Sequence, residues 1–252
     1  MVLSLLALTL SAAPEFSFGF TNQDGTKLLA LPPLGAPERL TKVVCDGRLL
    51  DVRYLRDQPK GPKDSGRQTA RNFDQVKGAL FKLVKGTMPA DALCVLATPA
   101  AFAKRKLLAV TTEIGERCDE KTASLMAELG KRQVTKCLPT GSFEGARLSF
   151  ASYELEGTTA LAGVGLTPET GGPAIRKFPA AWEKGSPSCW RADDGCEFDP
   201  SSYRVVFAMR GKEGLELFAL WAGAEGENAE VLRVAGAELK VIAAASRYWS
   251  PE

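Results

Sequence analysis

The sequence of 252 residues contains no histidine. Histidine is the general base of Ser-His-Asp and Cys-His systems, a ligand of zinc, copper and haem, and the side chain whose charge changes near neutral pH. Its absence excludes these chemistries from the functions open to the chain. For an enzyme, it leaves mechanisms built from Lys and Ser or from pairs of carboxylates.

Several short motifs are missing as well. The sequence has no Gly-x-x-x-x-Gly-Lys-Ser/Thr, Gly-x-Gly-x-x-Gly or Gly-x-Ser-x-Gly pattern, so a nucleotide site and a nucleophile elbow lose their usual support. It also has no Cys-x-x-Cys pair, the spacing of a zinc ribbon or a thioredoxin-like motif. We therefore predict no cofactor and no metal site.

The charge balance gives no overall case for nucleic acid as a partner. The net charge is only +2, and we interpret the basic stretches Lys104–Lys106 and Lys60–Arg71 as solvated loops. No apolar run is long enough to span a bilayer, which takes about 20 residues in a helix. We therefore predict neither a nucleic-acid partner nor a transmembrane segment.

The first residues have the pattern of an export signal. Val2–Leu10 is a short apolar run, and the small residues Ser11–Ala13 follow it before Pro14. This order is typical of the core and cleavage zone of a secretory signal peptide, which we place at residues 1–13. No Lys or Arg precedes the run, which a start codon placed too far downstream would explain. The alternative interpretation is a buried N-terminal strand.

Six cysteines follow the predicted signal, and an even number is typical of disulfides in an oxidising compartment. Six cysteines allow fifteen connectivities, of which proximity along the chain favours one. The compartment that we predict is the bacterial periplasm or the extracellular space. The favoured disulfides are Cys45–Cys94, Cys118–Cys137 and Cys189–Cys196.

Short apolar segments separated by Gly-containing turns indicate antiparallel strands along most of the chain. Tyr203–Ala243 is the clearest run and predicts a meander, while Asp24-Gly25 and Asp46-Gly47 predict hairpins nearer the N-terminus. Asp119–Lys131 predicts the main helix, because acidic residues begin it and basic residues end it, as the helix dipole favours. The predicted fold is α+β with β dominant, made of antiparallel hairpins and meanders in a sandwich- or barrel-like arrangement.

The cysteine counts permit a division near residue 140, with four cysteines before it and two after it. We predict a β-rich N-terminal subdomain over residues 14–140, which contains the helix, and a C-terminal meander subdomain over residues 141–252. One continuous domain is the alternative, since no linker-like composition marks the boundary. Pro168–Pro187 is predicted to be largely loop, because it is rich in Gly and Pro.

Acidic residues beside the meander are the candidates for catalysis. A carboxylate-based glycosidase needs two of them on either side of the scissile bond, and Trp182 and Trp190 lie near enough in sequence to stack on a sugar ring. Hard oxygen ligands in a loop also permit a calcium site, although their spacing differs from that of an EF-hand. The residues considered for calcium are Asp193, Asp194, Glu197 and Asp199.

A structural interpretation of the same acidic residues is the one that we favour. Asp193-Asp194-Gly195 is a good turn sequence inside a small disulfide loop, and Glu225–Glu227 is typical of a hairpin tip kept soluble by charge. If the protein has a binding site, these flanks of the meander are where we expect it. The candidate binding residues are Trp190, Arg191, Asp193, Asp194, Glu225 and Glu227.

These observations favour an exported protein that binds a partner and does not catalyse a reaction. The standard catalytic side chains are missing, and the chain uses its residues for strands and disulfides. The expected partner is a protein or polysaccharide of the cell envelope. A carboxylate-based polysaccharide hydrolase is the first alternative. The second is an inhibitor of a secreted protease or lysozyme, which would present the rigid loop Cys189–Cys196.

Overall fold

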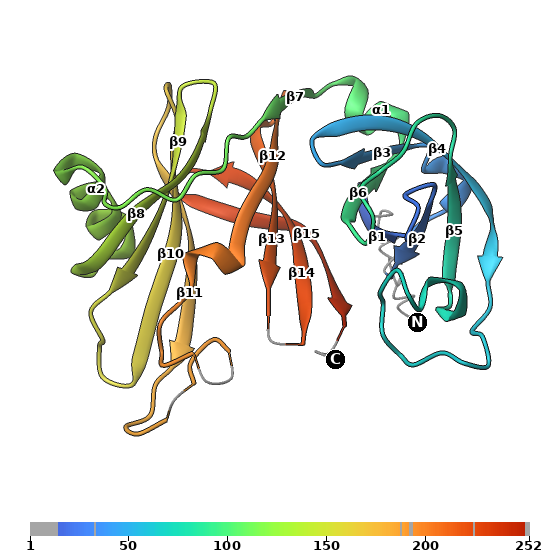
Figure 1. Cartoon of the computed structure of the whole chain (residues 1–252). Coiled ribbons are helices and arrows are strands. Elements are labelled where there is room, and N and C mark those ends of the chain that lie inside the picture. Colours follow the sequence, from blue (N-terminus) through green and yellow to red (C-terminus); the bar gives the residue numbers. More distant parts are fainter. Residues whose placement is uncertain (1–14, 33, 187, 192–193, 224, 250–252) are drawn as a thin grey trace, which may run out of the picture.

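The computed structural model describes residues 15–32, 34–186, 188–191, 194–223 and 225–249. The predicted signal peptide lies outside these residues. Two β-structures stand side by side in Figure 1, the first coloured blue to green and the second green to red. Strands dominate both, so the prediction of a β-dominant fold with antiparallel, barrel-like sheets is confirmed.

The N-terminal β-structure, which we call the first barrel, is a closed barrel of six strands. Both predicted hairpins belong to it. In the second of them, Asp46 and Gly47 have φ angles of 50° and 70°, as a type I′ turn requires. The strands in their order around the barrel are β1 (Phe16–Thr21), β2 (Lys27–Leu31), β5 (Gly78–Leu83), β4 (Arg48–Gln58), β3 (Lys42–Cys45) and β6 (Leu93–Ala97).

The C-terminal β-structure is a nine-stranded sheet that curls until its outermost strands meet, and we call it the second barrel. Thr111 exchanges two backbone hydrogen bonds with Ser142 and so closes the curl. The predicted meander forms its right-hand half in Figure 1. In sheet order the strands are β7 (Lys106–Ala109), β12 (Tyr203–Gly211), β13 (Gly214–Ala222), β14 (Gly226–Ala235), β15 (Glu238–Tyr248), β11 (Ala174–Ala181), β10 (Thr159–Thr167), β9 (Ala146–Tyr153) and β8 (Val134–Phe143).

A hydrophobic core joins the two barrels. Phe16, Phe18 and Phe20 alternate along β1 and all face the second barrel, where the ring of Phe18 stacks on that of Phe218 at 6.2 Å between centroids. Burying a side chain of this size stabilises a fold by about 1.5–3 kcal/mol. The aromatic face of the first strand therefore holds the barrels against each other, and each barrel has a further core inside it.

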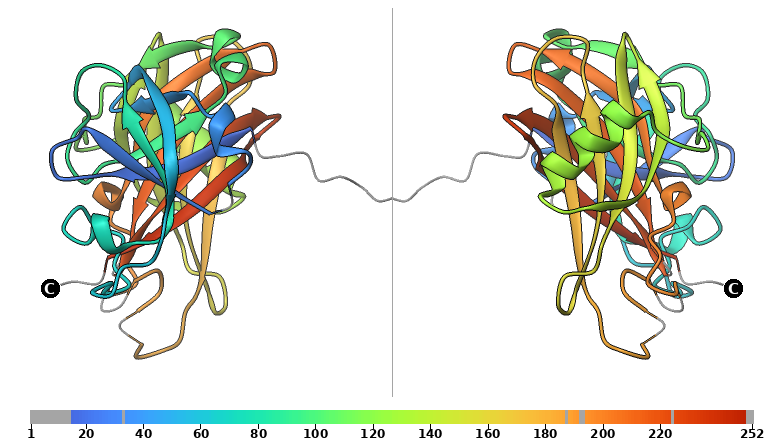
Figure 2. Two further views of the ribbon diagram at one scale, coloured as in Figure 1. Left: turned by 90° about the vertical axis from the view of Figure 1, so that its right-hand side faces the viewer. Right: turned by 90° about the vertical axis from the view of Figure 1, so that its left-hand side faces the viewer.

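The main helix, α2 (Glu120–Gly130), packs on the outer face of the second barrel and faces the viewer in the right-hand view of Figure 2. The side chain of Asp119 accepts a hydrogen bond from the backbone N–H of Thr122 and so caps the first turn. The left-handed residue that ends the helix is Lys131, at φ 57°, and Gly130 lies inside the last turn. A side chain at Gly130 would collide with the ring of Tyr153.

Short helical segments complete the described structure. Among the described residues, no helix has the length and apolar character needed to cross a bilayer. The shorter helical segments are α1 (Pro99–Ala103), which leads from one barrel to the other, and the 3₁₀ turns Pro37–Arg39, Phe73–Gln75 and Pro200–Ser202.

All three disulfides favoured by proximity are present. They indicate an oxidising compartment, which is where such bonds persist. Cys118–Cys137 links the start of α2 to β8, whereas Cys45–Cys94 joins β3 to β6 inside the first barrel.

Two boundaries differ from those in the sequence analysis. Pro168–Pro187 contains strand β11, because Ala174, Ile175 and Phe178 are buried and the strand pairs with β10 along its whole length. Residue 140 falls inside β8, and the change from one barrel to the other lies between β6 and β7. The prediction that Pro168–Pro187 is largely loop is therefore wrong, and β11 forms part of the wall beside the candidate site.

Candidate functional site

The second barrel has a pocket of about 350 Å³ at one of its ends, which we call the mouth pocket. It lies between β8, β9 and β10 and the connection from β11 to β12, which projects beyond the strands in Figure 1. Barrel mouths are among the preferred places for ligand sites. The principal lining residues are Lys136, Ser152, Ala160, Leu161, Trp182, Trp190, Glu197 and Phe198.

Strand register brings polar groups to this pocket. Ser152 lies directly opposite Lys136 on one side and Ala162 on the other, and Ala162 belongs to the core of the second barrel. Directly opposed residues share a face of the sheet. Lys136 and Ser152 are therefore on the inward face, at the level where the apolar core gives way to the pocket.

The pocket has an aromatic wall. The buried ring of Phe198 lies 5.5 Å from that of Trp190 and 5.1 Å from that of Phe178, measured between centroids. The indole N–H of Trp190 donates to the carbonyl oxygen of Phe178 at 3.0 Å, which fixes the ring orientation. Trp182 follows β11 directly and is half-buried. Two tryptophans thus stand at the pocket, each with part of its surface exposed.

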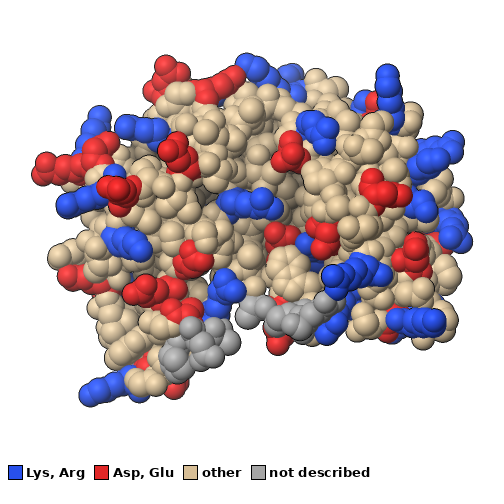
Figure 3. Space-filling view, in the orientation of Figure 1, with Lys and Arg blue, Asp and Glu red and all other residues tan. Residues whose placement is uncertain are grey.

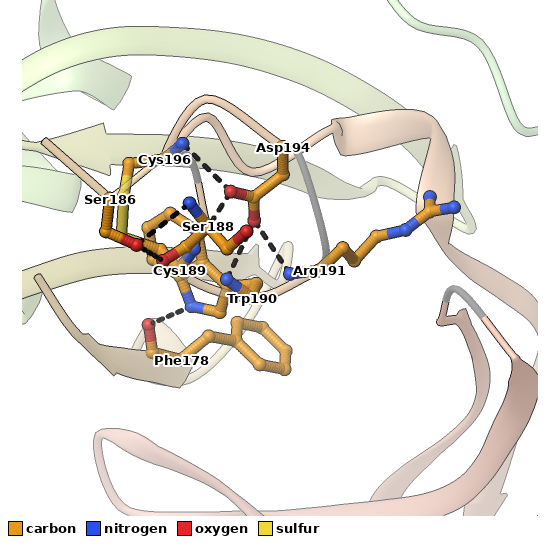
Figure 4. Close-up of a disulfide and its surroundings, with 8 residues drawn as sticks. All are labelled: Phe178, Ser186, Ser188, Cys189, Trp190, Arg191, Asp194 and Cys196. Carbon is orange, nitrogen blue, oxygen red and sulfur yellow. Dashed lines mark hydrogen bonds between the residues drawn. A yellow bond between two sulfur atoms is a disulfide. The ribbon is translucent and has the colours of Figure 1, made fainter.

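Asp194 holds the disulfide loop beside the pocket in shape. Figure 4 shows its carboxylate turned into the loop, where it accepts backbone N–H bonds of 2.7–2.9 Å from Cys189, Trp190, Arg191 and Cys196. Partial burial raises the pKa of Asp194, but these four donors outweigh it and hold the pKa below the usual value of 3.8. A carboxylate so fully engaged is unsuited to act as a general base or as a metal ligand.

We expect Asp194→Ala to destabilise the loop region by about 1–3 kcal/mol, because four backbone donors lose a charged acceptor. Since the folded pKa is depressed, the stabilisation by Asp194 is present above the unfolded pKa and is lost as pH falls through the folded value. Urea unfolding at pH 7 and pH 3 measures both effects. An Asp194→Ala protein as stable as wild type at pH 7 would contradict this assignment.

A second hollow of about 430 Å³ adjoins the mouth pocket and shares Lys136, Glu197 and Phe198 with it. Arg191 and Asp199 complete its charged rim. The carboxylate of Asp199 accepts bonds from the backbone N–H and the hydroxyl of Ser201, so it caps the 3₁₀ turn before β12. Glu197 is exposed, and none of the hydrogen bonds or ion pairs found for the described residues engages its carboxylate.

The candidate binding residues fall into three groups. Trp190, Arg191 and Asp194 lie together at the mouth pocket and the adjoining hollow. Glu225 is exposed on the turn before β14, as expected for a hairpin tip. Asp193 lies outside the described residues.

The prediction of a solvated hairpin tip is wrong for Glu227. This residue is only 7% exposed and pairs with the guanidinium of Arg247, itself 4% exposed, at the contact between the barrels. Burial is the main reason why the pKa of Glu227 is raised, although Arg247 opposes it. Glu227 faces the first barrel because it lies on the same face of β14 as Ala229, which packs in the core between the barrels.

Sequence analysis did not identify several groups that the fold brings together. Lys136, Ser152 and Phe198 come from three separate segments, and no local pattern announces that they meet. Buried Glu216 on β13 was also missed, although it accepts bonds from both Arg105 and Arg233. The one available signal was the single acid within the apolar run from 215 to 222.

The functional assignment rests on the site itself, because the comparisons with known proteins suggest no function. No family model, no curated protein and no solved structure matches this chain. Among the described residues, no three Cys, Asp or Glu side chains are grouped so that they could hold a metal ion. The mouth pocket and its aromatic wall are therefore the basis for the functional proposal.

Proposed function

We propose that this chain is an exported bacterial protein, periplasmic or secreted, that binds a polysaccharide of the cell envelope without cleaving it. The observation that carries the proposal is the pair of partly exposed tryptophans, Trp182 and Trp190, at one pocket of about 350 Å³. Three disulfides support the oxidising compartment.

The chemistry of the mouth pocket suits a saccharide ring. The flat faces of two indoles offer apolar contact to the C–H face of a sugar, and burying such rings contributes strongly to binding. Lys136, Ser152 and Glu197 add donors and acceptors for hydroxyl groups at the edge of the same pocket. A mainly apolar wall with a few polar groups that orient the ligand is the usual composition of a small-molecule site.

The carboxylates near the pocket argue against the hydrolase alternative. A glycosidase needs an acid and a second carboxylate that face the bond from either side. Asp194 is bound by four backbone donors and Asp199 by Ser201, which leaves Glu197 as the carboxylate with a free role among the described residues of the two hollows. One available carboxylate is one fewer than a glycosidase needs, so these contacts favour binding without cleavage.

The inhibitor alternative receives less support. An inhibitory loop presents its central side chains to the target, whereas Trp190 is turned inward and bonded to β11 through Phe178. Arg191 does extend away from the loop in Figure 4. Its half-buried position at the hollow beside the mouth pocket places it better for contact with a ligand there.

We expect the protein to bind at least one of chitotetraose, cellotetraose and maltotetraose, and Trp182→Ala to weaken that binding about tenfold or more, which corresponds to about 1.4 kcal/mol. Isothermal titration calorimetry measures the affinity. Tyr248→Ala is the matched control, because Tyr248 is an exposed aromatic residue on β15, outside the residues that line the mouth pocket.

Three outcomes would oppose the proposal. The first is that none of the three tetrasaccharides binds. The second is that Trp182→Ala and Tyr248→Ala weaken binding equally, which would show that the mouth pocket is not the binding site. The third is chromatographic detection of shorter products after incubation, which would restore the hydrolase alternative.

A further inference from the structure

Three cations stand directly beside one another on the outer surface of the first barrel. Lys82 of β5 lies opposite Lys27 of β2 on one side and Arg53 of β4 on the other. Side chains in directly opposed positions lie on the same face of the sheet, and neighbouring strands are only about 5 Å apart. Like charges in directly opposed positions destabilise a sheet. The row Lys27–Lys82–Arg53 is therefore a cost to folding.

Asp24 attracts Lys27 across the solvent, but no ion pair among the described residues offsets this cost. None of the three cations takes part in an ion pair with an acid among the described residues, and Arg56, one position past a bulge in β4, has no such partner either. The acid nearest in register is Asp51, which is already paired with Lys42. Lys82, Arg53 and Arg56 are exposed, and Lys27 is half-buried.

Exposed aliphatic side chains accompany the cations. Leu49, Leu55 and Val84 are 42%, 39% and 63% exposed, and they belong to β4 or to the residue after β5. The alternation of β4 and β5 puts Leu49, Arg53, Lys82 and Val84 on the outer face, since Val52, Phe81 and Leu83 fill the barrel interior. The outer face thus combines unpaired positive charge with apolar groups. We call it the β4–β5 face.

The distribution of charge along the chain also places an excess of positive charge on the first barrel. Residues 15–97 contain 13 Lys and Arg residues and 9 Asp and Glu residues, a net charge of +4, whereas the whole chain has +2. Figure 3 shows basic side chains along the right-hand margin, which the first barrel occupies. The β4 and β5 strands turn toward the viewer in the left-hand view of Figure 2. The positive charge is therefore concentrated on the barrel that lacks the mouth pocket.

We propose that the β4–β5 face docks on an anionic phospholipid surface. Lys and Arg near such a surface each contribute to attraction, and apolar side chains among them bury in the boundary between headgroups and acyl chains. A soluble polyanion satisfies the cations but leaves Leu49 and Val84 in water. This inference is independent of the mouth pocket, which belongs to the other barrel.

Flotation with vesicles tests the proposal. We expect wild-type protein to float with vesicles of phosphatidylcholine that contain about one third phosphatidylglycerol, and to stay in solution with phosphatidylcholine alone. Arg53→Glu/Lys82→Glu should weaken the binding by about 30-fold or more. Lys121→Glu/Lys212→Glu is the matched control. It also takes the net charge from +2 to −2, but it changes two exposed cations of the second barrel, one on α2 and one on the turn between β12 and β13.

Leu49→Ser/Val84→Ser separates a bilayer from a soluble polyanion. On a bilayer this variant should bind several-fold less tightly than wild type while it retains the same dependence on salt. Equal binding to neutral vesicles, equal losses in the two charge-reversal variants, or no effect of the serine substitutions would each overturn the proposal.

Lys82→Glu alone provides a readout that a general loss of folding cannot imitate. It places a carboxylate between Lys27 and Arg53, so we expect Tm to rise by about 2–4 °C while binding to anionic vesicles falls. A variant that is both less stable and less bound would contradict the interpretation of the row as a cost retained for docking.

Discussion

Replacing Arg247 by methionine is expected to lower the free energy of unfolding by about 3–5 kcal/mol, because it leaves Glu227 buried without its cation. Arg247 also donates to the carbonyl and side-chain oxygens of Asp91, both at 2.9 Å, and so ties β15 to the first barrel. Its guanidinium lies 4.9 Å from the ring of Trp249. One substitution thus removes charge, hydrogen bonds and packing at the contact between the barrels.

The pH dependence of this effect is fixed by Glu227. Its folded pKa is raised above the ordinary value of 4.5, first by burial, so its contribution to stability is present below the unfolded pKa and is lost as pH rises through the folded value. Without Arg247 the pKa rises further. The loss caused by Arg247→Met should therefore be smaller at pH 4 than at pH 8.

Urea unfolding at the two pH values measures this prediction, with Arg210→Met as the control. Arg210 pairs with Glu144 on the surface, where both side chains are exposed, so its loss should cost at most about 1 kcal/mol. Equal effects of the two substitutions would show that the contact between the barrels contributes little to stability.

Removing the Cys45–Cys94 disulfide by Cys45→Ala/Cys94→Ala should cost about 4 kcal/mol, the largest of the three losses that the chain-entropy relation gives for this protein. The bond closes a span of 49 residues, whereas Cys189–Cys196 closes 7 and should contribute about 2.5 kcal/mol. Both Cys45 and Cys94 are fully buried in the first barrel. A barrel of about 80 residues has a small core, for which such a crosslink matters.

Thermal and urea unfolding of the two double-alanine variants compares the crosslinks. We expect the first variant to lose more stability than the second, and to lose it chiefly in the first barrel. The reverse order would indicate that the loop beside the mouth pocket, and not the first barrel, limits the stability of the chain.

Local patterns were sufficient to predict much of the fold. The hairpins at Asp24-Gly25 and Asp46-Gly47, the helix after Asp119 and the meander from Tyr203 each depend on neighbours in sequence, so turn chemistry and periodicity reveal them. The disulfides were predictable for a similar reason, since their separations of 7 and 19 residues leave one remaining pair.

What the sequence could not predict depends on long-range pairing. The closure of a nine-stranded sheet through a single bridge, Thr111 to Ser142, has no local signature. Glu227 was assigned to a solvated tip because acidic residues are common there, but the first barrel covers it and Arg247 pairs with it. The mouth pocket combines Lys136 with Trp190, which lie 54 positions apart in the sequence.

The resonances of the four tryptophan indole N–H groups test the central claim most directly. In a ¹H–¹⁵N spectrum titrated with whichever tetrasaccharide binds, we expect shifts for Trp182 and Trp190, the two tryptophans that line the mouth pocket. The signal of Trp249, at the contact between the barrels, should stay in place. Shifts at Trp249 with none at Trp182 and Trp190 would contradict the assignment of the mouth pocket as the binding site.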